Sequence, residues 1–190
     1  MKLQVTGHFL FLLGISIWFG ALVFLGYGVA PVNFSTAEAW EMTGTNPAHP
    51  EIEQHARNIG GELTARSIER LNQLEMIAIL LCGIGLAIFW FVRFNRPHLL
   101  IAQTSILCLM IVIFLIYGHY IANELAEIRA LYPLDFAVTD ELEKSVQRLR
   151  FDSLHQWYTR LSGVNIILAL SQIALSAAQY SGLRYGIKEP

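Results

Sequence analysis

The sequence has few charged side chains and few cysteines for its length. Asp, Glu, Lys and Arg make up 15% of the 190 residues, against roughly 25% in ordinary soluble domains. Hydrophobic residues make up 54%, which argues against a soluble globular domain. The formal net charge of -2 argues against nucleic acid as a partner. Cys82 and Cys108 both lie in apolar segments and are interpreted as packing residues rather than a disulfide or metal pair.

Four long stretches contain no carboxylate, amine or guanidinium, and they are residues 9–30, 76–92, 99–122 and 161–183. A helix needs about 20 residues to cross the hydrocarbon core of a bilayer. A backbone in lipid must satisfy its own hydrogen bonds, which favours helices. The sequence therefore predicts an all-α integral membrane protein. We expect one domain over residues 1–190, an antiparallel four-helix bundle with a helical extramembrane cap. The expected helices are about 6–31, 70–94, 98–130 and 153–182, and the expected outer loops are about 32–69 and 131–152.

The distribution of cations predicts how the chain is oriented. The short connector "VRFNRPH" contains Arg93 and Arg96 and no acid, and Lys2 precedes the first apolar stretch. Positive charge in short loops marks the cytoplasmic side of a membrane. We therefore expect a multi-pass protein of the cell (inner) membrane with both termini in the cytoplasm and the lipid bilayer as its main partner.

Polar and small residues, rather than apolar ones, indicate which face of a membrane helix points inward, because lipid is as apolar as leucine. In the last stretch such residues recur at alternating steps of four and three, the heptad pattern of a left-handed bundle. This 158–179 face consists of Tyr158, Ser162, Asn165, Ala169, Gln172, Ser176 and Gln179. Interhelical hydrogen bonds that serve packing alone are the simplest interpretation of its polar members.

Two further faces follow the same logic. The first apolar stretch has small residues at Gly7, Gly14, Ala21 and Gly28, which would let a neighbouring helix approach closely. The second has Glu75, Ala78, Cys82 and Gly85 on one face. We therefore expect Glu75 to point into the bundle rather than toward lipid.

Ionisable groups expected near the outer end of the bundle form a candidate metal site. Glu75, His119, Glu124 and His155 offer the nitrogen and oxygen ligands that suit a divalent transition metal. The alternative is structural: Arg148 or Arg150 pairs with Glu124 or Glu75 and neutralises the carboxylate. No two of these histidines share a metal-ligand spacing along the chain.

Histidine pairs also allow a haem hypothesis. Two histidines at one depth on facing helices can clamp a haem iron, and His8 with His98, or His119 with His155, meet the depth condition for haem b. No nucleophile with its base, phosphate loop or nucleotide fingerprint is present, so classical catalysis is not expected.

The segment "RLRFDSLHQWYTRLSGVNIILAL" resembles the motif that starts the last helix in the transmembrane-protein-205-like domain of unknown function. Arg150, Phe151, His155 and Asn165 match that motif, and Arg129 matches a second region of resemblance, "YGHYIANELAEIR". The acidic insert after Pro31 departs from the family pattern. The resemblance implies a four-helix membrane protein whose activity is not established.

Three function classes remain open at this point. The protein binds or moves a metal ion or small cation at the outer site, serves as a non-catalytic accessory or assembly subunit, or is a haem-binding redox protein. For the accessory class the small residues of the first stretch would contact partner helices or a second copy. We also expect residues 148–165 to form a hinge, with His155 touching Glu75, the region of His119, or a bound ion.

Overall fold

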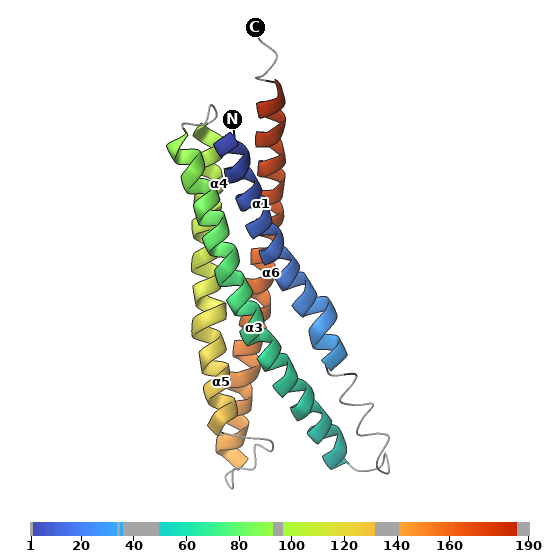
Figure 1. Ribbon diagram of the computed structural model, residues 1–190. Helices are drawn as coiled ribbons and strands as arrows, with labels where there is room; N and C mark the ends of the chain where they lie inside the picture. Colours follow the sequence, from blue (N-terminus) through green and yellow to red (C-terminus); the bar gives the residue numbers. More distant parts are fainter. Residues whose placement is uncertain (1, 34, 36–49, 93–96, 132–140, 186–190) are drawn as a thin grey trace. The chain divides into compact units, whose positions relative to one another are not determined.

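The computed structural model describes residues 2–33, 35, 50–92, 97–131 and 141–185, and nearly all of them are helical, with no strand among them (Figure 1). The connector with Arg93 and Arg96, which carried the prediction of orientation, lies outside these residues. The named elements are α1 (Lys2–Val23), η1 (Phe24–Val29), α3 (Pro50–Phe91), α4 (Pro97–Phe114), η2 (Leu115–Ile121), α5 (Ala122–Leu131) and α6 (Glu141–Tyr185).

Four helical stretches of the described residues are long and apolar enough to cross a membrane: Leu3–Asn33, Ile59–Phe91, Pro97–Ala130 and Val146–Gln179. Their number agrees with the prediction, and the all-α class is confirmed. Large apolar side chains are also exposed along them, as expected for surfaces that meet lipid. Examples are Phe9, Leu13, Phe24, Leu80, Ile84, Ile101, Leu109, Val112, Ile167 and Leu170. The chain thus has the properties of a multi-pass membrane protein.

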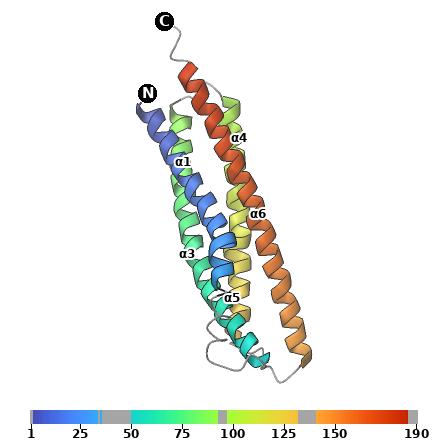
Figure 2. The same cartoon turned by 90° about the vertical axis from the view of Figure 1, so that its right-hand side faces the viewer.

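Two helices extend well beyond the predicted bounds. α3 begins at Pro50 rather than near residue 70, and α6 begins at Glu141 rather than near residue 153. Both run without interruption in Figures 1 and 2. The Gly60–Gly61 pair, which weakens a helix by intrinsic propensity, lies inside α3. Side chains supply hydrogen bonds there, because Thr64 Oγ1 donates to the Gly60 carbonyl at 2.8 Å.

Two short π-helical segments, η1 and η2, interrupt the α-helical pattern. In a π turn the hydrogen bond joins residues five apart instead of four, and such turns are rare and frequent at functional sites. The backbone N–H of Ala30 donates to Leu25 O at the end of η1. Nothing in the apolar periodicity predicted either segment.

The helices contribute to two compact units, each built from segments that are distant in the sequence. The first unit combines the described parts of Met1–Ala21, Gln73–Leu115 and Ser162–Pro190. The second unit combines those of Leu22–Asn72 and Ile116–Leu161. The largest fully buried side chains of the first unit are Phe11, Ile15, Trp18, Phe89, Met110, Gln103, Gln172, Gln179, Glu75, Asn165 and Cys82. Polar groups are thus part of this core.

Within the first unit α1 and α3 approach very closely at glycines. A Cβ atom added at Gly14 would lie 2.7 Å from Cys82 Sγ and 2.8 Å from Ala78 O. One added at Gly85 would lie 2.7 Å from Gly7 O. Glycine is therefore needed at these contacts, and the predicted close approach is confirmed at Gly7 and Gly14, whereas a Cβ at Gly28 would meet only Phe24 of the same helical stretch.

Candidate functional site

A buried carboxylate, that of Glu75, lies in the first unit. Glu75 is 1% exposed, and its Oε1 accepts a hydrogen bond of 3.0 Å from the indole Nε1–H of Trp18. Trp18 is itself fully buried and packs edge to face on Phe114, with ring centroids 6.2 Å apart. The predicted inward direction of Glu75 is confirmed. Its bond from Trp18, which comes from a helix distant in the sequence, was not predicted.

Uncharged amides make the polar contacts between α4 and α6 in the same unit. Asn165 Nδ2 donates to the Met110 carbonyl at 3.2 Å, and Gln172 Nε2 donates to the Gln103 carbonyl at 2.7 Å. Gln103 Nε2 donates to Ser176 Oγ at 3.2 Å. Membrane helices commonly associate through such hydrogen bonds.

The predicted 158–179 face is confirmed as an inward face. Tyr158, Asn165, Ala169, Gln172, Ser176 and Gln179 are all buried, and Ser162 is half-buried. Gln103 is the partner that the sequence analysis missed. It is the only amide residue among residues 99–122, directly before Thr104 and Ser105, and that was its only signal in the sequence.

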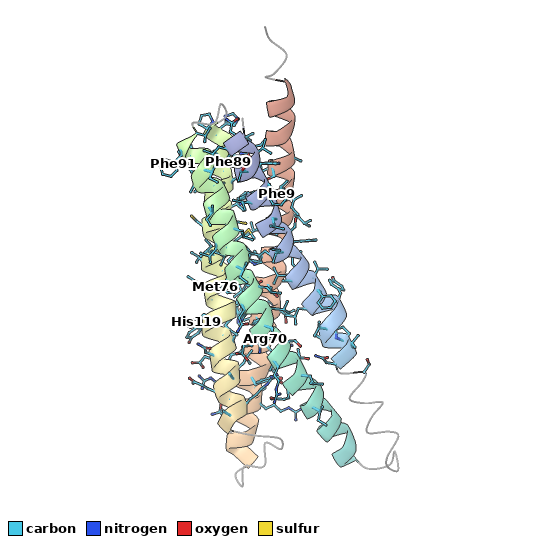
Figure 3. All side chains as sticks on the ribbon, viewed as in Figure 1. Phe9, Arg70, Met76, Phe89, Phe91 and His119 are labelled. Atoms are coloured by element: carbon cyan, nitrogen blue, oxygen red, sulfur yellow. The ribbon has the colours of Figure 1, made fainter. Side chains whose placement is uncertain are left out.

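The histidines proposed as haem ligands lie in different environments. His8 is buried, with its ring centroid 6.3 Å from that of Phe89, whereas His98 is exposed. His119 and His155 are both exposed, and His119 points outward from its helix in Figure 3. Asn123 Nδ2 lies 3.5 Å from His119 Nδ1. The haem pairs stay a prediction.

In the second unit Arg150 forms an ion pair with Glu124. This is one of the pairings that the structural alternative predicted, and it is confirmed. The ion pair occupies an oxygen of a carboxylate that had been considered as a metal ligand. Arg148 is exposed.

Arg129 and Phe151, both singled out by the family resemblance, contact each other in the second unit. The Arg129 guanidinium carbon lies 5.4 Å from the centroid of the Phe151 ring, and its Nη1 donates to the Gly61 carbonyl at 3.0 Å. His155 stacks parallel to Phe151 with centroids 6.3 Å apart. Guanidinium and aromatic faces attract each other electrostatically, so these residues tie α5 to α3 and α6.

The predicted hinge at residues 148–165 is a continuous part of α6. His155 is exposed, and its ring contacts Phe151 in the preceding turn. The structure thus places His155 on an outer surface of the helix rather than at the buried contact that we expected. Residues that contain the acidic insert after Pro31 lie largely outside the described part of the chain.

Among the residues that the structure describes, no group of three or more His, Cys, Asp or Glu side chains is arranged to hold a metal ion. Glu75 belongs to the first unit, while His119, Glu124 and His155 belong to the second. The four-residue metal site therefore stays a prediction.

Comparisons with known proteins add no assignment. The resemblance to the transmembrane-protein-205-like domain accordingly stays a proposal based on the matched residues. No family model, curated protein or solved structure matches this chain.

Proposed function

We propose that the chain is an inner-membrane protein that binds and moves a small cation at Glu75. The observation that carries this proposal is a carboxylate that is 1% exposed inside a stretch apolar enough to span a membrane. Ionisable groups at such depth are costly, and they commonly mark ion or proton pathways. The Trp18 indole N–H donates to Oε1 and orients the carboxylate.

The proposed architecture is an antiparallel four-helix bundle with a helical cap and both termini in the cytoplasm. Trp90, which is exposed at the end of the span Ile59–Phe91, supports a membrane location, because tryptophan and tyrosine concentrate at membrane interfaces. The orientation itself rests on Arg93 and Arg96 in the sequence.

A proton or a monovalent cation suits Glu75 better than a transition metal. Protein-bound zinc usually takes three or four side-chain ligands, and no such group exists among the described residues. Glu124 is engaged by Arg150, and His119 and His155 are exposed. A single oriented carboxylate is sufficient for a proton.

The accessory-subunit hypothesis has lost its main support. It assigned the small residues of the first apolar stretch to a partner helix, but α3 of the same chain fills the space at Gly7 and Gly14. The cation hypothesis is therefore the one we retain.

Flux measurements on the purified protein in liposomes test the proposal. Vesicles loaded with a pH-sensitive dye, or with dyes for Na⁺ or K⁺, report the entry of each cation under an imposed gradient. We expect at least one flux above that of protein-free vesicles, and a loss of about tenfold or more in the Glu75→Gln variant.

The matched control is Glu62→Gln, because Glu62 is an exposed residue of α3 that pairs with Arg66. This control should retain the flux. Absence of flux for all three cations, or a flux that Glu75→Gln leaves intact, would show that Glu75 does not carry a cation.

A further inference from the structure

The interior of the first unit contains glutamine amides whose hydrogen-bonding capacity is not used. Gln103 and Gln172 are fully buried and Gln179 is 1% exposed. The Oε1 atoms of Gln103 and Gln172, and both Oε1 and Nε2 of Gln179, have no hydrogen-bond partner in the part of the chain that the structure describes. Buried polar atoms almost always have a partner, either protein or ordered water.

These amides form one cluster rather than scattered exceptions. Gln172 donates to the Gln103 backbone, and the Gln103 side chain donates to Ser176 one turn farther along α6. Gln179 follows Ser176 by three residues and shares its buried face. Gln103, Gln172 and Ser176 therefore meet at one short stretch of the α4–α6 contact, and Gln179 lies about one turn farther along the same buried face of α6.

Turning the amide groups over does not remove the unused atoms. The partner of Gln172 is a carbonyl oxygen, so its nitrogen has to point there and its oxygen stays unused. Gln179 has both amide atoms unused, which no rotation of its amide changes. As the amides are oriented in the structure, the cluster has three unused oxygens and one unused nitrogen.

Water fits this set better than an ion. All four side chains are uncharged, and a charge placed among neutral groups in a low-dielectric interior is costly. A buried water molecule typically makes about three hydrogen bonds to polar groups that lack other partners, and a set rich in acceptors can receive both of its hydrogens.

We propose that Gln103, Gln172, Ser176 and Gln179 form an internal hydration site that holds ordered water between α4 and α6. The site is separate from Glu75 and does not depend on the proposed cation function. Gln103 lies within two turns of the start of α4 at Pro97. Because the water completes their hydrogen bonding, these amides can be buried in an apolar span.

Water-edited solid-state NMR of the full-length protein in liposomes tests the site. Protein labelled with ¹⁵N-glutamine and ¹⁵N-alanine is prepared, and the transfer of magnetisation from water to each N–H group is timed. We expect the Gln179 side-chain amide to receive it within about twofold of the rate for exposed Gln156, and much faster than the backbone amide of buried Ala169. A Gln179 rate as slow as that of Ala169 would overturn the proposal.

The Gln179→Met variant gives an independent answer because methionine has a similar length and no amide. If water occupies the site, the variant removes the amide that hydrogen-bonds this water. We then expect Tm to fall by roughly 2–4 °C, the shift for about 1 kcal/mol in a domain of this size. If the amide is dry, its removal relieves an unmet polar group and Tm rises. The exposed control Gln156→Met should leave Tm unchanged. An unchanged or raised Tm in Gln179→Met contradicts the site.

Discussion

In the first unit the fully buried polar side chains are mostly uncharged amides, whereas the second unit contains an ion pair whose side chains are partly exposed. Asn165 and Gln172 donate to backbone carbonyls in a fully buried environment. By contrast, the side chains of Arg150 and Glu124 are 53% and 23% exposed. Glu75 is the exception in the first unit, because it is ionisable and buried.

The difference follows from the cost of taking a charge out of water. A neutral amide needs one or two hydrogen bonds to be accommodated in an apolar interior, while a buried ion pair often fails to recover its desolvation cost. Charge is therefore expected near water and amides deeper in the core. A buried carboxylate departs from this pattern, and that departure is the reason for assigning a function to Glu75.

The largest effect is expected where α1 and α3 touch in the first unit. In Gly14→Ala the new methyl group would meet Cys82 Sγ, Ala78 O and Cys82 N at 2.7–2.9 Å. Two of these atoms are backbone, so the helices have to separate. We expect a loss of about 3 kcal/mol or more, at the upper end for overpacking, in SDS-titrated unfolding in mixed micelles.

Gly20→Ala is the matched control, since a Cβ at Gly20 would meet nothing within 4 Å. It should be neutral or slightly stabilising because alanine favours helix over glycine. Equal stabilities of the two variants would mean that the α1–α3 contact is not tight at Gly14.

A smaller effect is expected for the donor to the buried carboxylate. Trp18→Phe keeps a large aromatic ring but removes the N–H that donates to Glu75. Hydrogen bonds to charged groups contribute about 1.5–3 kcal/mol, so we expect a loss of about 2 kcal/mol in the same assay. Trp157→Phe replaces an exposed indole and should change stability by less than about 0.5 kcal/mol. Equal losses in both variants would speak against a special role for the buried bond.

The smallest effect is expected for the ion pair of the second unit. A double-mutant cycle with Glu124→Gln and Arg150→Gln should give a coupling of about 0.2–1 kcal/mol, typical of exposed pairs. The coupling should fall in 1 M salt because of screening. A coupling above that of the Trp18–Glu75 bond would reverse the contrast drawn between the two units.

The features predicted from the sequence were those that a helical repeat encodes. The inward face at 158–179 and the face of Glu75, Ala78, Cys82 and Gly85 were predicted because small and polar residues are conspicuous in apolar helices. All four residues of the latter face are buried. The spacing of these residues along the helix identifies the inward face without knowledge of the neighbouring helix.

Partners were harder to predict than faces. Trp18 donates to Glu75, and Gln172 donates to Gln103, because helices distant in the sequence pack together. No local pattern in the sequence specifies these pairings. α3 runs through the glycine pair to Pro50, and Arg129 of α5 donates to the Gly61 carbonyl there. Long-range contacts overrode the low helix propensity of the glycine pair.

The π segment η1 shifts the phase of α1's surface pattern. Each π turn takes one residue more than an α turn, so a position after residues 24–29 faces another direction than the preceding repeat implies. Gly7, Gly14 and Ala21 are buried at steps of seven, whereas Gly28, inside η1, is only half-buried. A periodic function fitted to residue accessibility along Leu3–Asn33 would therefore need a change of phase within η1.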